Sequence, residues 1–162
     1  MWSQIRGEAI AGPLAGIPLE TVTTQLLTWG AWKEKYPFTK VLSTKTGYVR
    51  DYSRDPYPSY YESEEVWFPV EHKNDTFHPK TKILGIALSG TSKAYPFPEL
   101  DKSGAIITDR IRGKEIRIRF DRENQTAILE SPATEDAEAT TLFWFAWVAF
   151  HPETDVYYHS RE

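Results

Sequence analysis

The alternation of apolar and polar residues is clearest in the second half of the chain, where it predicts β-strands. Residues 115–120, Glu-Ile-Arg-Ile-Arg-Phe, place the apolar side chains on one face and the charged ones on the other, as in a strand with one buried face. Residues 83–88, Ile-Leu-Gly-Ile-Ala-Leu, form a continuous apolar run of strand length, which a Ser-Gly turn ends. Similar stretches lie at 93–97, 105–107 and 126–129, so we expect antiparallel strands from residue 83 onward.

One pattern, W-x-A-W-x-x-x-x-P-x-T-x-V, occurs twice without a gap, at residues 29–41 and at residues 144–156. In each copy the two tryptophans are three residues apart, which places them on one face of a short helix. The proline at position 37 or 152 then ends the helix, and a short strand is predicted after it, at 41–42 and at 156–158. The repeated pattern indicates two copies of one structural unit. We expect the indoles to pack in the core, and a platform for ligand stacking is the alternative.

These elements predict an α+β domain, mostly antiparallel β-sheet, with two short Trp-bearing helices and an internal pseudo-repeat. Within one domain of residues 1–162, residues 1–60 would be the end of a first repeat-like unit, 61–82 a connector, and 83–158 the second unit. Glycines at 7, 12 and 16 fit tight turns between short extended pieces. Residues 131–139 are acidic and poor in apolar side chains, and they are predicted to form a solvated loop.

Composition removes several functional classes. The chain has 162 residues and no cysteine, which excludes disulfides, thiol nucleophiles and cysteine-ligated zinc. A net charge of −4 argues against a general nucleic-acid binder. No apolar stretch approaches the roughly 20 residues that a membrane span requires, and the N-terminus lacks a signal-peptide pattern, so a soluble, cytoplasmic chain without a membrane span is expected. No nucleotide or other cofactor motif is present, and no cofactor is predicted.

The tyrosine-rich segment at 43–65 supplies the main candidate binding residues. They are Arg50, Asp51, Tyr52, Tyr57 and Tyr60. Arginine can pair with a carboxylate or phosphate, tyrosine can stack or donate a hydrogen bond, and aspartate can hold sugar hydroxyls or act as a base. The alternative is a loop that Arg–Asp pairs and tyrosine packing hold in place.

Three further side chains extend this candidate pocket. Lys93 and Tyr95 are two residues apart in a predicted strand and therefore share a face. His151 follows two tryptophans on one helical face, and it would titrate near neutrality or simply cap the helix C-terminus.

A metal site is the weakest of the candidate sites. His72, Asp75 and His78 are ligand types, but their H-x-x-D-x-x-H spacing matches neither a helical HExxH nor a zinc finger. The charged and amide residues around them indicate an exposed connector, so no metal is predicted.

Several stretches resemble the domain of unknown function 3179 family. They are Trp-Ser-Gln-Ile-Arg-Gly from residue 2, Val-Leu-Ser-Thr-Lys-Thr-Gly-Tyr-Val-Arg-Asp-Tyr at 41–52, Asp-Pro-Tyr at 55–57, Lys-Ala-Tyr-Pro at 93–96, and Phe-Trp-Phe-Ala-Trp at 143–147 followed by His-Pro-Glu-Thr at 151–154. The resemblance runs through nearly the whole chain and implies no established activity. Fuller members resemble two copies of one unit and often look exported, and this chain resembles their C-terminal part. Their Cys-Pro-x-Cys element falls at residues 120–123, where this chain has no thiol.

Three functional hypotheses follow. The first is a noncatalytic module that binds a small molecule, a glycan or a protein, because 14% of the residues are aromatic and no catalytic signature is present. The second is an enzyme of unassigned class, with a pocket near Arg50, Asp51, Lys93, Tyr95 and His151. The third is a structural subunit that another chain completes, as a homo-oligomer or a larger assembly.

Overall fold

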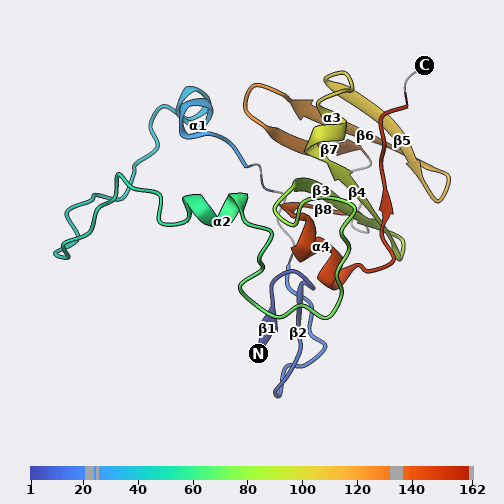
Figure 1. Cartoon of the computed structure of the whole chain (residues 1–162), viewed down its shortest axis with the longest axis horizontal. Coiled ribbons are helices and arrows are strands. Elements are labelled where there is room, and N and C mark those ends of the chain that lie inside the picture. The colour runs from blue at the N-terminus through green and yellow to red at the C-terminus, as the bar shows by residue number, and fades with distance from the viewer. Residues whose placement is uncertain (21–23, 25, 132–136, 161–162) are drawn as a thin grey trace.

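The computed structural model describes residues 1–160 apart from 21–23, 25 and 132–136. Its elements, in chain order, are β1 (Trp2–Ser3), β2 (Glu8–Ala9), α1 (Trp29–Lys35), α2 (Pro58–Glu62), β3 (Lys82–Leu88), β4 (Thr91–Pro96), α3 (Phe97–Leu100), β5 (Ile106–Ile111), β6 (Lys114–Asp121), β7 (Thr126–Ser131), β8 (Ala137–Phe143), α4 (Trp144–Phe150) and β9 (Asp155–Val156). The strands form three sheets, β1-β2, β8-β3-β4-β9 and β5-β6-β7 (Figure 1). This is the expected α+β fold with mostly antiparallel strands, and the described residues form four short helices where two were predicted.

Strand β3 is the centre of the four-stranded sheet. It pairs antiparallel with β4 on one side and with β8 on the other, and β9 joins the outer edge of β4 in parallel. The β3–β4 connection is Ser89-Gly90, with φ of 51° and 74°, and the β5–β6 connection is Arg112-Gly113, with φ of 48° and 79°. Positive φ at both central residues is typical of the two-residue turns that match the twist of a hairpin. The Ser-Gly turn predicted after residue 88 is therefore confirmed.

The four-stranded sheet lies between two other layers. Leu84, Ile86 and Leu88 belong to the cluster that includes Ile116 and Ile118 of the three-stranded sheet. The alternate residues of β3, which face the opposite side of the sheet, contact α4 instead. Because β3 is covered on both faces, its sequence is a continuous apolar run, whereas β6 is covered on one face and alternates.

Helix α4 packs directly on β3 through its tryptophans. Trp144 and Trp147 are 0% and 2% exposed. A Cβ atom added at Gly85 would lie 2.4 Å from the six-membered ring of Trp147, so the glycine makes room for the indole. The Trp147 Nε1 donates a hydrogen bond to Thr154 Oγ1 at 2.8 Å, and the Trp144 Nε1 donates to the Asn74 carbonyl at 2.7 Å. The prediction of core packing is confirmed for these two indoles.

The same prediction is wrong for the first tryptophan pair. Trp29 and Trp32 on α1 are 50% and 36% exposed. The residues of the first copy do form the predicted helix, which ends before Pro37, but in the described part of the chain no sheet covers its aromatic face. Local sequence determines the helix, whereas burial requires a partner layer from elsewhere.

Two strand assignments also differ from the prediction. Strand β8 begins at Ala137, within the predicted loop, and the loop residues 132–136 lie outside the described part of the chain. Most side chains of β8 are at least partly exposed, so the apolar signal of a strand is weak there. In contrast, Val41 and Leu42 form no strand and are 66% and 96% exposed. Strand pairing depends on a neighbouring strand, which residues 41–42 do not have in the described structure.

The two larger sheets form the body of the domain, and the N-terminal part of the chain extends away from this body (Figure 1). Among the described residues of 1–68, Ala9 is the single buried one. Gly7, Gly12 and Gly16 have φ of 63°, 94° and 86°, which confirms the predicted turns. None of the helices in the described ranges has the length and apolar character to cross a lipid bilayer.

Candidate functional site

A partly buried polar cluster joins β4 to β5. The Tyr95 hydroxyl donates a hydrogen bond to Asp109 Oδ2 at 2.8 Å, and the Lys93 Nζ lies 2.7 Å from the same oxygen. Burial raises the pKa of Tyr95 well above its ordinary range, and the neighbouring Asp109 carboxylate adds to the rise. Burial also raises the pKa of Asp109, but hydrogen bonds from Lys93, the Arg110 backbone and Tyr95 outweigh it and leave that pKa below its ordinary value. The cluster is an ion pair with a neutral phenol.

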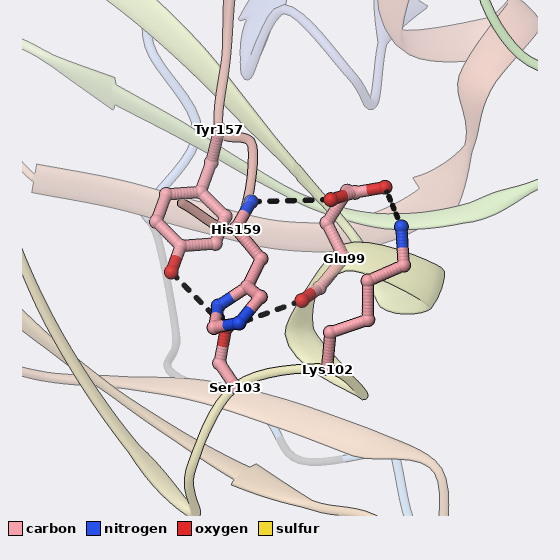
Figure 2. A network of polar contacts seen from close by, with 5 residues as sticks. All are labelled: Glu99, Lys102, Ser103, Tyr157 and His159. Carbon is pink, nitrogen blue, oxygen red and sulfur yellow. Dashed lines mark hydrogen bonds and ion pairs between the residues drawn. The ribbon is translucent and has the colours of Figure 1, made fainter. Parts of the chain in front are cut away.

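A second polar network lies next to Tyr95 and includes Tyr157. Tyr157 stacks on Tyr95 with ring centroids 5.4 Å apart. Its hydroxyl lies 3.1 Å from Ser103 Oγ, which in turn lies 3.1 Å from His159 Nδ1 (Figure 2). The Ser103 Oγ also lies 3.2 Å from the Glu99 carbonyl. A hydroxyl has one proton and two lone pairs, so these three partners occupy its full hydrogen-bonding capacity.

Glu99 on α3 holds the end of the C-terminal segment. Its Oε2 accepts a hydrogen bond from the His159 backbone at 3.1 Å, and its Oε1 lies 2.5 Å from Lys102 Nζ. The hydrogen bond from Lys102 is the main cause of a pKa below the ordinary value for Glu99. The network therefore fastens residues 157–159 against α3, and it presents no unpaired nucleophile.

A shallow cavity of about 410 Å³ lies beside Ser103 and β6. Its two cations already have carboxylate partners, because Arg119 pairs with Glu130 and Arg122 with Asp101. The cavity therefore lacks a free positive charge for an anionic ligand.

A larger cavity of about 650 Å³ is formed mainly by residues 64–79, beside α4. Its lining includes the rings of Trp67, Phe68, Phe77 and Phe145. Lys80 holds the start of the segment that forms the wall of this cavity. Its side chain is buried, with the residue 6% exposed, and its Nζ donates hydrogen bonds to the backbone carbonyls of residues 63 and 65. The same Nζ lies 4.4 Å from the centre of the Tyr60 ring, a cation–π contact.

The three candidate metal ligands, His72, Asp75 and His78, all line this cavity. His78 Nδ1 accepts a hydrogen bond from the Lys80 backbone at 3.2 Å, so one of its ring nitrogens is engaged. Among the residues that the structure describes, no three histidine or acidic side chains are placed to hold a metal ion. Aromatic rings and polar side chains thus line the same cavity.

The family model for "Protein of unknown function (DUF3179)" matches residues 1–154. This chain belongs to the DUF3179 family. No curated protein and no solved structure matches it. The family assignment covers the body, the 64–79 cavity and the exposed N-terminal part of the chain.

The structure spreads the predicted site residues of this DUF3179 chain over separate places. Arg50, Asp51 and Tyr52 are exposed on the segment that leaves the body. The Asp51 carboxylate accepts hydrogen bonds from the side chain and backbone of Ser53, which lower its pKa, and the Tyr52 hydroxyl lies 2.9 Å from Thr46 Oγ1.

Tyr57 and Tyr60 contact Trp67 instead, with ring centroids 5.8 and 4.5 Å apart. These two tyrosines therefore support the segment that walls the larger cavity of the DUF3179 domain, and the described contacts of Asp51 and Tyr52 are with their own loop.

His151 and the Lys93–Tyr95 pair lie on opposite faces of the four-stranded sheet. His151 is the C-cap residue of α4, and its ring stacks on Trp147 with centroids 3.8 Å apart. Burial lowers its pKa, against a smaller effect of Glu138 that raises it. In β4, Ala94 belongs to the α4 side, so its neighbours Lys93 and Tyr95 point to the other side. The DUF3179 sheet therefore separates His151 from the pair.

Sequence reasoning missed Asp109, the shared partner of Lys93 and Tyr95. Ile107 and Ile111 are buried in β5, and Asp109 shares their face. An acidic residue at an inward position of a strand is a signal that could have identified it. Ser103 and His159 gave no such signal, because their meeting depends on where the C-terminal segment of the DUF3179 chain crosses α3.

Proposed function

We propose that this domain is a noncatalytic protein-interaction module, whose residues 1–68 dock on another polypeptide. The observation that carries the proposal is the exposure of apolar side chains in this region. They are Met1, Trp2, Ile5, Ile10, Leu14, Ile17, Leu19, Leu26, Trp29, Trp32, Tyr36, Phe38, Val41, Leu42, Tyr48, Val49, Tyr52, Tyr57, Tyr61, Trp67 and Phe68. Scattered apolar residues are normal on a surface, but a concentration of large ones over one region is typical of an interaction site.

The arrangement of the body supports a noncatalytic role. Ser103, the hydroxyl nearest to a histidine ring in Figure 2, has all its hydrogen-bonding positions occupied. Lys93 and Tyr95 are paired with Asp109 in a partly buried cluster, and His151 lies across the sheet from them. An enzyme would bring such groups together at one accessible point.

The cavity formed by residues 64–79 favours a second candidate function, the binding of a small molecule or glycan. Its volume of about 650 Å³ lies within the usual range of ligand sites, and its aromatic rings can stack on a sugar or other flat ligand. A thermal-shift panel of glycans and metabolites tests it, and unchanged unfolding temperatures with every compound would remove this candidate.

We also propose that the chain contains two repeat-like units, with residues 1–60 the end of the first, 61–82 a connector, and 83–158 the second. The matching conformations of α1 and α4 support this division. Among its described residues the first unit, unlike the second, has no sheet over its tryptophans, which supports a role as a subunit completed by another chain.

Site-specific photo-crosslinking in cells tests the interaction. A benzophenone amino acid is placed at Phe38 or Leu42, which are 95% and 96% exposed, and at Glu115 on the outer face of β6 as the matched control. We expect discrete adducts with one polypeptide from the first two positions and none from Glu115. Adducts of equal yield from all three positions, or none from any, would contradict the proposal.

A further inference from the structure

We infer that α1 packs on a β-sheet of the docking partner, with the geometry that α4 shows on its own sheet. The partner sheet carries a glycine opposite Trp32 and an acidic edge. This inference rests on the proposed interaction and names the chemistry of the partner surface.

The two helical segments have the same local structure. Trp32 Nε1 donates to Thr39 Oγ1 at 2.9 Å, and Trp147 Nε1 donates to Thr154 Oγ1 at 2.8 Å. The residue that ends each helix has φ and ψ of −132° and 72° in α1, and −132° and 66° in α4. Both segments therefore place the second indole against the chain that follows the helix.

The second copy shows what this structure packs against. The Trp147 ring lies over Gly85 of β3, beside Ile83 and Ala94. The chain after α4 then forms β9 and pairs in parallel with β4, with Val156 opposite Ala94. A glycine-bearing sheet and a free strand edge are thus the surface to which this segment is matched.

The first copy lacks both of these contacts. Trp32 has no strand beneath it in the described structure, and Val41, which corresponds to Val156 in the repeated pattern, is 66% exposed and unpaired. A sheet of the same kind would cover Trp32 and provide an edge strand for residues 40–41. One partner surface therefore accounts for both exposed features.

Helix α1 is already held with its aromatic face outward. Thr28 at its N-cap hydrogen-bonds Asn124 in the β6–β7 turn, and Ala31 lines a cavity of about 250 Å³ together with residues of β6 and β7. The helical repeat places Trp29, Trp32 and Tyr36 on a different side from Ala31. The body thus presents the aromatic side to a partner.

Charge distinguishes the partner sheet from β3 and β4. Residues 29–50 carry five cations, Lys33, Lys35, Lys40, Lys45 and Arg50, and one acid, Glu34, in a chain whose net charge is −4. Lys33 occupies the position in the pattern that Val148, 2% exposed, has in the second copy. A basic segment of this kind complements an acidic sheet edge.

A graft within the full chain tests whether the first copy is built for such a sheet. Residues 144–156 are replaced by the sequence of residues 29–41 with Val148 retained, and the control graft has the same residues in scrambled order. We expect the first graft to unfold cooperatively with shielded tryptophan emission, and Gly85→Ala to destabilise it as it does the parent. Equal instability of the two grafts would overturn the inference.

Crosslink mapping tests the packing in trans. A benzophenone amino acid at Tyr36, which is on the aromatic side of α1, is expected to form adducts with a glycine-containing strand of an acidic partner, and the Glu115 control is expected to form none. Adducts with a helix, with a disordered segment or with a second copy of this chain would overturn it. Discrete partner adducts from Phe38 together with failure of the graft would retain the interaction and reject the sheet. No partner adducts from any position would reject the interaction itself.

Discussion

Replacing Gly85 with alanine tests the packing of α4 on the sheet. The new methyl carbon would lie 2.4 Å from the Trp147 ring, whereas ordinary van der Waals contact begins at 3.4 Å. Strand β3 is hydrogen-bonded to β4 and β8 on both sides, so its backbone is fixed and the indole must retreat by the difference.

The cost has two parts. Overpacking of a filled core typically costs about 1–3 kcal/mol. A displaced indole also weakens the hydrogen bond from Trp147 to Thr154, which contributes about 1 kcal/mol. We therefore expect Gly85→Ala to lower the free energy of unfolding by about 2–4 kcal/mol.

Urea denaturation followed by tryptophan fluorescence and circular dichroism measures this change. Gly104→Ala is the matched control, because the nearest heavy atom to its added carbon is 3.9 Å away, and its effect should stay within about 0.5 kcal/mol. Combining Gly85→Ala with Trp147→Leu should cost less than the sum of the two single changes, since the contact is removed. If Gly85→Ala is as stable as Gly104→Ala, the close packing of indole on glycine is refuted.

Three further outcomes are expected. Thr154→Val leaves the buried Nε1 of Trp147 without a partner and should cost about 1–3 kcal/mol in urea denaturation, while Thr39→Val, beside the half-exposed Trp32, should cost less than about 0.5 kcal/mol. Lys80→Met should release the wall of the 650 Å³ cavity, so limited proteolysis should cleave within residues 57–67 faster, with the body intact; unchanged cleavage would contradict this role. The pKa of Asp109 is lower in the folded chain than its ordinary value of 3.8, so its stabilisation is present above that pH and is lost as the pH falls through the folded pKa. Urea midpoints should show this acid-side loss in the parent and less of it in Asp109→Asn, and parallel profiles would argue against the ion pair.

The local structure of several segments could be predicted from the sequence. The alternation at 115–120, the continuous apolar run at 83–88 and the prolines after each tryptophan pair correctly predicted β6, β3 and the ends of α1 and α4. These features depend on the side-chain period and on the conformational limits of proline, which act within a few residues.

The candidate sites were less predictable. The sequence correctly placed Lys93 and Tyr95 on one face of a strand. Their shared partner Asp109 comes from another strand and was not predicted. Ser103 and His159 meet because the C-terminal segment crosses α3, and no local pattern marks that crossing. Long-range contacts of this kind depend on how the sheets, helices and connecting segments pack against one another.

The sequence by itself determined that residues 29–41 and 144–156 each begin with a short helix that ends before a proline, because these features are encoded within each segment. Only the tertiary structure decided that one pair of tryptophans is buried and the other exposed. A tryptophan is buried only where an apolar layer covers its ring and excludes water. Strand β3, with Gly85, provides that layer for α4 and not for α1.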